Sequence, residues 1–289
     1  MRRIYILILL ILIMAITHAA IKAPGESGLA SEWNADHVIS SGLQPKLTAT
    51  LIVAANDSEN TEQADYVCDG VADQAEINTA IAALPANGGR VLLLEGTYNL
   101  TSWIIPGNSV TIEGQGYGTR LNAQGIDAVI YAIGKTRIIV KDLLIIGTES
   151  GAGDTAGIKF EVCTYSQMIR VYTVFDGDFG LWISGGYRNM ISNCYAWNTN
   201  IIGIFVSQHI AQTIENIVND CYAKGGNNGI RIGLDADRNI VEGCIAEGGT
   251  DSIFISDAAS DRNIIHGNIA RDGITDNGTN SVVADNIVA

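Results

Sequence analysis

The sequence predicts an all-β solenoid, a single-stranded parallel β-helix with an amphipathic capping helix at its N-terminal end. Three observations predict it. A nine-residue pattern, RNMISNCYA at 188–196, returns three times, and a four-residue strand pattern such as GIFV at 203–206 recurs between the copies. Upstream of both, the segment 69–100 has the pattern of a helix followed by a strand. A repeated unit of this kind indicates stacked coils.

The nine-residue pattern sets the period of the coils. Its copies recur at intervals of 27, 23 and 24 residues, counted from Asn189, Asn216, Asn239 and Asn263. A period in this range is typical of a solenoid. Extending the register gives further expected starts at Asn108, Arg137, Gln167 and Ser281.

One position of the pattern predicts an internal ladder. Five residues after the starts from 137 onward, the expected column consists of Asp142, Tyr172, Cys194, Cys221, Cys244, Asn268 and Asn286. Residues at one repeat position stack in a solenoid. We expect the three cysteines to be buried free thiols, since free Cys packs as a small hydrophobe. The two asparagines should satisfy their amides along the stack, because an unpaired buried amide costs about 1–3 kcal/mol.

The four-residue pattern predicts a second strand in each coil. It reads small, apolar, variable, apolar, which is the two-residue alternation of a strand and is too short for a helix. Its copies are GIKF at 157–160, GLWI at 180–183, GIFV at 203–206, GIRI at 229–232 and SIFI at 252–255. Two or three such strands per period make one coil of a parallel β-helix.

The segment 69–100 predicts the capping helix. Asp73 is placed as its N-cap with Glu76 three residues later, the arrangement of a capping box. Pro85 ends the helix, and a strand follows at 91–94. One face would be apolar, through Ile77, Ile81 and Leu84. Such a helix can cover the open end of the first coil.

The same segment carries a resemblance to a known superfamily. The run Asp69-Gly70, helix, Gly88-Gly89, strand and Glu95-Gly96-Thr97-Tyr98, followed by Asn-rich coils, resembles the right-handed parallel β-helix proteins of the pectate-lyase-like superfamily. The resemblance covers roughly residues 48–289 and implies a right-handed coil. It implies no single activity, because the superfamily includes polysaccharide lyases, hydrolases, phage tail-spike depolymerases and non-catalytic adhesins. In addition, SEWNADHVI at 31–39 is similar to a segment of phage tail-fibre proteins.

The N-terminus has the pattern of a secretory signal peptide over residues 1–19. Arg2 and Arg3 precede the apolar run 4–16, and small residues follow it. That run is shorter than the about 20 residues that span a bilayer, although a retained anchor is the alternative. We therefore expect a secreted or cell-surface protein, or alternatively a virion-associated one. The expected organisation is an extension at 20–47, an N-terminal cap at 48–107 and repeats at 108–289.

Composition excludes one class of partner. The chain of 289 residues is 47% hydrophobic and carries a formal net charge of −14. A nucleic-acid backbone requires clustered Lys and Arg, so we expect no nucleic-acid partner. The mature chain should also have no stable membrane insertion.

The catalytic residues of the superfamily match this chain poorly. For its polygalacturonase-like branch, Asp176-Gly177-Asp178 separates the paired acids, His266-Gly267 lacks the preceding Gly, and Gly233 follows Arg231-Ile232. For its lyase branch, the resemblance implies Ca²⁺ held by carboxylates and an Arg or Lys that takes the proton. We therefore expect Arg231 as the base, with Asp178 and Asp251 as catalytic carboxylates, and calcium at Asp176, Asp178 and Asp251.

The variable position of the strand pattern should point outward, because its apolar neighbours point inward. Along the solenoid this position gives Ile130, Lys159, Trp182, Phe205, Arg231 and Phe254. Asn200 and Asn228 belong to the turns beside it. Rings beside amides and carboxylates suit a sugar chain, so we expect Trp182, Phe205, Phe254, Lys159, Asn200 and Asn228 to bind substrate. The alternatives are a subunit interface and a surface covered by the chain's own loops.

Three functions remain open from the sequence. The first is an exported β-helix that binds, and as a lyase or hydrolase cleaves, an extracellular acidic polysaccharide. The second is a non-catalytic surface adhesin, and the third is a trimeric tail-spike subunit that binds a receptor. The coil that begins at Ser281 has no cap after it in this sequence, so we expect another protomer or a partner chain to cover its edge. The alternatives are that DNGTNS at 276–281 folds back over the end or that the last coil frays.

Overall fold

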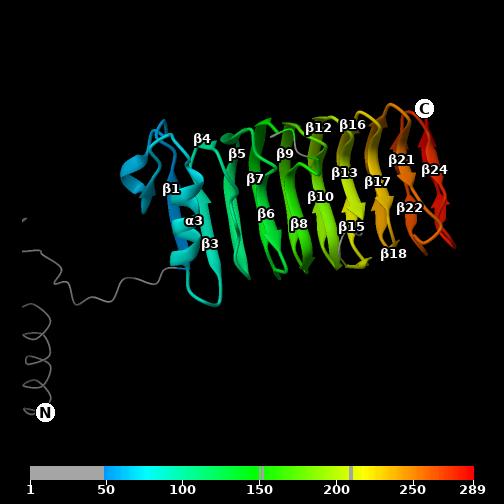
Figure 1. Ribbon diagram of the computed structural model, residues 1–289, viewed down its shortest axis with the longest axis horizontal. Coiled ribbons are helices and arrows are strands. Elements are labelled where there is room, and N and C mark those ends of the chain that lie inside the picture. The colour runs from blue at the N-terminus through cyan, green and yellow to red at the C-terminus, as the bar shows by residue number, and fades with distance from the viewer. Residues whose placement is uncertain (1–48, 150, 152, 208–210) are drawn as a thin grey trace, which may run out of the picture. The chain divides into compact units, whose positions relative to one another are not determined.

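Short strands with alternating apolar residues stack coil upon coil into a parallel β-helix (Figure 1). The computed structural model describes residues 49–149, 151, 153–207 and 211–289. Strands of successive coils pair in parallel in both sheets, so like residues lie over one another at about 4.8 Å. The predicted all-β solenoid is confirmed.

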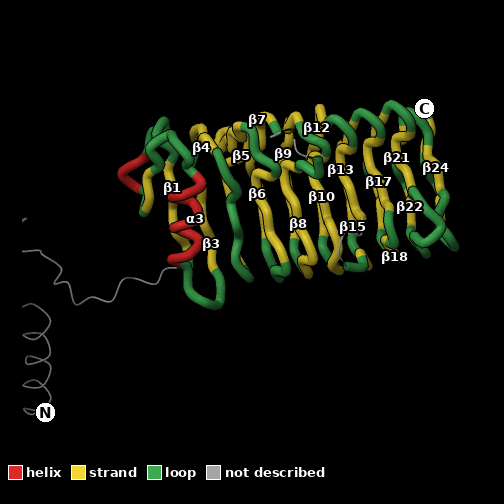
Figure 2. Tube along the Cα trace, viewed as in Figure 1, coloured by secondary structure: helices red, strands yellow, loops and turns green. Residues whose placement is uncertain are grey.

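The strands form two sheets, separated by the turns that Figure 2 shows in green. Sheet A consists of β1 (Thr50–Ala54), β2 (Tyr66–Val67), β3 (Gly89–Leu93), β4 (Gly96–Leu100), β5 (Val110–Gln124), β7 (Ile139–Thr148), β9 (Gln167–Asp176), β11 (Met190–Ser192), β12 (Tyr195–Thr199), β15 (Ile217–Asn219), β16 (Tyr222–Gly225), β19 (Ile240–Glu242), β20 (Ile245–Gly248), β22 (Ile264–His266), β23 (Ile269–Ala270), β25 (Val282–Ala284) and β26 (Ile287–Val288). Sheet B consists of β6 (Ala128–Ile133), β8 (Ala156–Thr164), β10 (Phe179–Tyr187), β13 (Ile202–Ser207), β14 (Thr213–Ile214), β17 (Asn228–Gly233), β18 (Ala236–Asp237), β21 (Asp251–Ile255) and β24 (Ile274–Asp276).

Several sequence predictions fall outside the described residues. These are the signal peptide at 1–19, the extension at 20–47 and the tail-fibre-like segment at 31–39. Within the part of the chain that the structure describes, no helix is both long and apolar enough to cross a membrane.

A ladder of buried asparagines explains the first position of the repeat. The side-chain oxygen of Asn216 accepts hydrogen bonds from the backbone N–H and the amide of Asn189, at 2.8 and 3.0 Å. Asn239 accepts from Asn216 in the same way, at 2.9 and 3.0 Å, and Asn263 accepts from Asn239 at 2.9 and 3.2 Å. All four are buried, so each amide satisfies a backbone donor that water cannot reach.

The predicted cysteine ladder is confirmed in the later coils. Cys194, Cys221 and Cys244 are buried free thiols. The N–H of Cys194 donates to the sulfur of Cys221 at 3.4 Å, and the N–H of Cys244 donates to the side-chain oxygen of Asn268 at 2.9 Å. The backbone N–H of Asn268 donates in turn to the side-chain oxygen of Asn286 at 2.9 Å, which continues the ladder.

The predicted register of the earlier coils is wrong by one residue at Arg137 and Gln167 and by two residues at Asn108. Tyr195 pairs with Tyr172, and Leu143 pairs with Val171, so the buried column begins with Leu143 and Val171 instead of Asp142 and Tyr172. The matching starts are Ile138 and Ser166, and Val110 replaces Asn108. A slip of one residue reverses the face of every side chain in a strand. In the structure, a residue with positive φ precedes the column in these coils, Asp142 at 58° and Arg170 at 49°.

The predicted N-terminal helix is present as α3 (Gln74–Ala83), beside β1 and β3 (Figure 1). Its residues Ile77 and Ile81 belong to the main apolar core. The predicted capping box is wrong, because the Asp73 side chain does not cap the helix. Its carboxylate instead accepts the backbone N–H groups of Gly70 and Asn99, at 2.8 and 2.7 Å, and so ties the helix start to β4.

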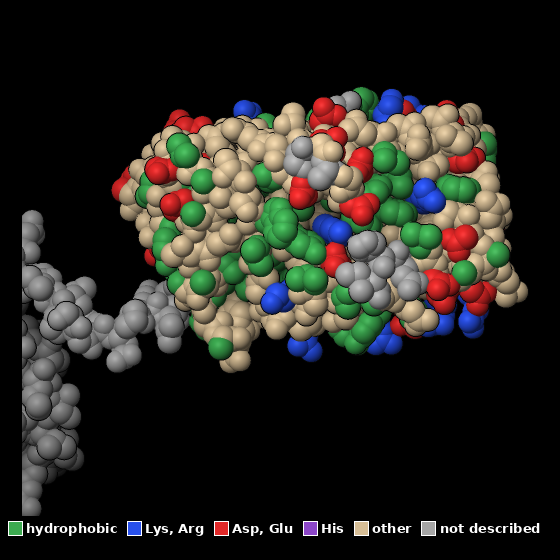
Figure 3. Space-filling model, viewed as in Figure 1, with side chains coloured by type: hydrophobic (Ala, Val, Ile, Leu, Met, Phe, Trp, Pro, Cys, Tyr) green, Lys and Arg blue, Asp and Glu red, His purple; other side chains and the backbone are tan. Residues whose placement is uncertain are grey.

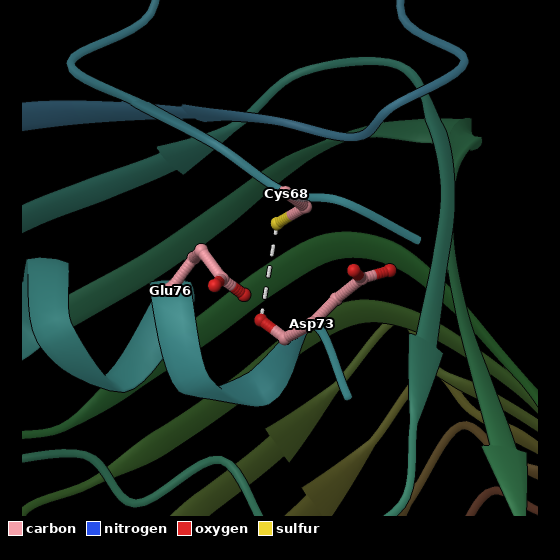
Figure 4. A group of neighbouring side chains, drawn as sticks. All are labelled: Cys68, Asp73 and Glu76. Atoms are coloured by element: carbon pink, nitrogen blue, oxygen red, sulfur yellow. Dashed lines mark hydrogen bonds between the residues drawn. The ribbon is translucent and has the colours of Figure 1, made fainter. Parts of the chain in front are cut away.

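Cys68, Asp73 and Glu76 come together at the start of α3 (Figure 4). Their possible metal-ligand atoms lie within 4.8 Å of one another, but a metal needs the thiolate form of Cys. Burial, reinforced by the charges of Asp73 and Glu76, raises the pKa of the Cys68 thiol well above its usual value. The thiol donates to the carbonyl of Asp73 at 3.8 Å. This arrangement fits a neutral structural thiol.

The last coil leaves apolar side chains uncovered. The exposed fractions are 52% for Val282, 42% for Val283, 61% for Ile287 and 62% for Val288. Val283 and Val288 stack on the buried residues Ile265 and Ala270, respectively. The cover by another protomer or a partner chain stays a prediction.

Candidate functional site on the outer face of sheet B

The outward position of sheet B forms a continuous row across six strands. Pairing of β6, β8, β10, β13, β17 and β21 aligns Tyr131, Lys159, Trp182, Phe205, Arg231 and Phe254, which we call the outer row. Five of the six predicted members are confirmed in this register. Ile130 is wrong, because it pairs with Ile158 on the inner face and is fully buried. Tyr131 takes its place.

The centre of the outer row is buried, which corrects the prediction of an exposed platform. Trp182 is 2% exposed and Phe205 is 6% exposed. They form a second apolar cluster with Ala156, Phe179 and Ile202. The ring centroid of Phe179 lies 4.7 Å from that of Trp182 and 5.0 Å from that of Phe205. In Figure 3, hydrophobic side chains gather in the middle of the solenoid with basic and acidic ones among them.

A sequence signal for this burial was present. The stretch Phe179–Ile183 has a residue compatible with burial at every position, and so does Ile202–Val206. Near-continuous apolar runs are typical of strands buried on both faces. Strict alternation of apolar and polar residues is typical of strands with one face exposed to solvent. β10 is buried at every residue except Tyr187.

A buried ion pair lies at the N-terminal side of this cluster. The amine of Lys159 lies 3.1 Å from the carboxylate of Glu161, with side-chain exposed fractions of 11% and 5%. The hydroxyl of Tyr131 donates to the same carboxylate at 2.9 Å. Burial, followed by this bond, raises the pKa of Tyr131 to about 12. The Lys159 amine also lies 4.0 Å from the ring centroid of Trp182.

This pair limits what Lys159 can do. A buried cation with a carboxylate at hydrogen-bond distance is already neutralised, and separating the two would leave a buried charge. Glu161 and Tyr131 are not among the site residues predicted from the sequence. Glu161 follows Lys159 by two residues on the same strand, so alternation alone predicts that both side chains point outward.

Arg231 differs from Lys159, because among the described residues it forms no ion pair. Its guanidinium carbon lies 5.6 Å from the ring centroid of Phe205 and 5.3 Å from that of Phe254. The Nε atom is buried and has no hydrogen-bond partner in the described part of the chain. Burial lowers the pKa of Arg231 from its usual value, opposed by the charge of Asp257.

Asp257 does not neutralise Arg231 by contact. Its carboxylate accepts the backbone N–H of Leu234 at 2.6 Å, the hydroxyl of Ser256 at 2.9 Å and the N–H of Ala259 at 3.1 Å. Arg231 nevertheless keeps its proton, because a guanidinium is not deprotonated in proteins. The arrangement suits an anion anchor better than the predicted general base.

The predicted calcium and catalytic carboxylates are not brought together. Asp178 precedes β10 and Asp251 begins β21, three strand spacings away in sheet B, or roughly 14 Å. One Asp178 oxygen accepts the backbone N–H groups of Asp154 and Thr155, at 2.8 and 3.4 Å, and Asp251 accepts the hydroxyl of Thr275 at 2.7 Å. Within the described ranges, Asp176, Asp178 and Asp251 form no metal-ligand group. The predicted calcium set is therefore wrong.

The other predicted binding residues lie at the edge of the outer row. Asn228 is 4% exposed, and its amide donates to the carbonyl of Asp251 at 3.0 Å, so it holds two coils together. Asn200 is exposed, and its amide lies 3.5 Å from a Glu149 oxygen. Phe254 is half-buried. Asn200 and Phe254 therefore keep surface that a ligand can reach.

The comparisons with known proteins show the fold. No protein-family model and no curated protein sequence matches the chain. The solved structure of pectate lyase Pel9A matches with a TM-score of 0.56 and 14% identity, over 76% of this chain and 63% of that one. The chain thus spans less than two thirds of that lyase.

Two pectin methylesterase structures match over more of their own length. The enzyme from Aspergillus niger gives a TM-score of 0.53 at 10% identity, over 83% of this chain and 87% of that one. PemA from Erwinia chrysanthemi gives 0.51 at 15% identity, over 78% and 80%. Structural similarity at this level of sequence identity shows a shared fold and does not show a shared function. The chain has the right-handed parallel β-helix fold of the pectate-lyase-like proteins.

Proposed function

We propose that this chain binds an acidic polysaccharide along the outer face of sheet B, with Arg231 as the anchor for a sugar carboxylate. The proposal rests on Arg231, which is a half-buried cation between two aromatic rings. The Nε atom of Arg231 has no hydrogen-bond acceptor among the described residues. A desolvated charge without a partner is costly. A carboxylate ligand would relieve that cost, because it can accept two parallel N–H bonds from one guanidinium.

The neighbours of Arg231 support a sugar acid over a simple anion. Phe254 is half-buried and stands one coil from Arg231, so its ring can pack against the apolar C–H face of a pyranose. Asn200 adds an exposed amide at the edge of the same sheet. The names of the structural neighbours, pectate lyase and pectin methylesterase, belong to the same ligand class and guide the choice of probe.

Binding of a galacturonate hexamer, measured by titration calorimetry at about 0.15 M salt, tests the proposal. We expect the Kd of Arg231→Met to rise at least about tenfold, since a charge-assisted hydrogen bond contributes about 1.5–3 kcal/mol. The thermal midpoint of Arg231→Met should equal or exceed that of the wild type, because the variant removes an uncompensated cation.

Arg238→Met is the matched control, because Arg238 is 41% exposed at its side chain and, unlike Arg231, already belongs to an ion pair, with Glu215 at 3.6 Å. Its Kd should be that of the wild type. Unchanged hexamer binding by Arg231→Met would overturn the proposal. A fall of many degrees in its thermal midpoint would show instead that Arg231 is a structural residue.

Export and cleavage are separate parts of the proposal. A polysaccharide ligand fits a secreted or cell-surface protein, in agreement with the signal peptide predicted at 1–19. The same incubation, with and without Ca²⁺, reports cleavage, since elimination creates unsaturated ends and hydrolysis creates reducing ends. A surface adhesin would bind without either product, and a tail-spike subunit would have the mass of a trimer.

A further inference from the structure

A second group of aromatic side chains lies on the outer face of sheet A, away from the outer row. Tyr172, Tyr195 and Tyr222 stack at one outward position of β9, β12 and β16. Their ring centroids are 5.9 and 4.7 Å apart, and Tyr117 lies 4.2 Å from Tyr172. Trp197 packs beside this stack, 5.8 Å from Tyr195 and 5.7 Å from Tyr222. Trp197 is 36% exposed.

Charged side chains from three successive coils meet beside these rings. Glu247 accepts the hydroxyl of Tyr222 at 2.6 Å, lies 3.0 Å from the amine of Lys224, and forms an ion pair with Arg271. The hydroxyl of Tyr222, with help from the two cations, lowers the pKa of Glu247. We call Tyr222, Lys224, Glu247 and Arg271 the Glu247 cluster.

The Glu247 cluster has N–H donors without a partner among the residues that the structure describes. Two cations share one carboxylate, which is 11% exposed at its side chain, while Lys224 and Arg271 are 44% and 55% exposed. The nearby carboxylate of Asp272 instead accepts the N–H of Gly248 at 3.0 Å and lies 3.4 Å from the hydroxyl of Ser252. Glu247 therefore orients two cations whose remaining N–H groups face solvent.

One of these cations, Lys224, also lies beside the exposed tryptophan. The Lys224 amine is 4.9 Å from the ring centroid of Trp197. An apolar ring next to oriented N–H donors matches a sugar acid, which has an apolar C–H face and an anionic edge.

We propose that Trp197 and the Glu247 cluster form a second binding site for acidic sugars, in which Lys224 and Arg271 bind the anionic group and Trp197 packs against the ring. The site extends the proposed function to the other sheet. It shares no residue with the Arg231 site, so each site can fail alone. A chain with both sites binds two short acidic oligosaccharides.

Calorimetry with the galacturonate hexamer tests the second site, and the expected stoichiometry is two hexamers per chain. Arg271→Ala and Trp197→Ala should each weaken one of the two sites about tenfold and leave the Arg231 site unchanged. Trp197→Ala leaves both ion pairs of Glu247 in place. Weaker binding by this variant therefore cannot result from disruption of the Glu247 cluster. Arg231→Met should weaken the Arg231 site and leave the second site unchanged.

Arg262→Ala is the matched control. Arg262 is 59% exposed at its side chain and pairs with Asp261 at 2.6 Å, so its removal should change neither site. Wild-type binding by both Arg271→Ala and Trp197→Ala would overturn the second site and leave the proposed function standing. A change of sedimentation mass in these variants, with binding unchanged, would also overturn it and assign the surface to contacts between copies.

Discussion

Replacing Asn216 by Leu should lower the free energy of unfolding by about 4 kcal/mol and the thermal midpoint by about 10 °C. Asn216 is fully buried. Its side-chain oxygen accepts two hydrogen bonds from Asn189, and its amide donates to Asn239 at 3.0 Å. Leu has a similar volume but no polar atoms, so the variant leaves buried donors unpaired at about 1–3 kcal/mol each. Denaturant unfolding followed by circular dichroism measures the change.

Asn227→Ala is the control for the ladder. Asn227 is exposed, and its described hydrogen bonds use only its backbone: its N–H donates to the carbonyl of Ile201, and its carbonyl accepts the N–H of Thr250. We expect a change within about 0.5 kcal/mol. Equal stability of the Asn216 and Asn227 variants would contradict the account of the ladder as a main support of the coils.

Gly186→Ala should be at least as destabilising, with an expected loss of about 5 kcal/mol. Gly186 has φ of +93°, and a Cβ placed there would lie 1.9 Å from the carbonyl oxygen of Cys163. That oxygen belongs to the preceding coil and accepts the amide of Asn189 at 2.8 Å. The added methyl group must therefore separate two coils and disturb the ladder at its first asparagine.

Gly267→Ala separates the steric part of this effect from the conformational part. Gly267 also has positive φ, at +65°, but its Cβ would meet nothing within 4 Å. We expect a loss of about 1–2 kcal/mol from the left-handed backbone alone. The comparison of the two variants by thermal unfolding measures the clash, and similar losses would contradict a close contact between coils at Gly186.

The coils could be predicted because the repeat appears directly in the sequence. Stacked asparagines and cysteines recur at a nearly fixed interval, and their chemistry is the same in each coil. The register failed at Arg137 and Gln167, where Ile138 and Ser166 stand in place of the ladder asparagine. Without a repeated Asn, the sequence offers no marker for the residue with positive φ that turns the chain, and an error of one residue reverses the face.

The candidate site was harder to predict, because burial on the outer face depends on more than one strand. The outward direction of Trp182 and Phe205 could be predicted from alternation, but their burial depends on Phe179 and Ile202 of the same sheet. Asp178 and Asp251 occur at similar repeat positions, yet backbone N–H groups and Thr275 use their oxygens. Such local partners cannot be seen in a repeat alignment.

The sequence contains a pattern that marks the aromatic surface on sheet A. Tyr195 and Tyr222 each follow a ladder cysteine directly, in the copies CYA at 194–196 and 221–223. A residue that follows an inward ladder position must point outward on the next strand. The charged partners come from other coils, so Glu247 and Arg271 could be placed beside Tyr222 only with the register known.

A crystal structure of the protein with a bound galacturonate hexamer tests the central claim most directly. The account predicts a sugar carboxylate on the outer face of sheet B, with its oxygens about 2.7–2.9 Å from the guanidinium nitrogens of Arg231, and a pyranose ring against Phe254. A hexamer bound elsewhere, with the guanidinium of Arg231 still without an anionic partner, would contradict it.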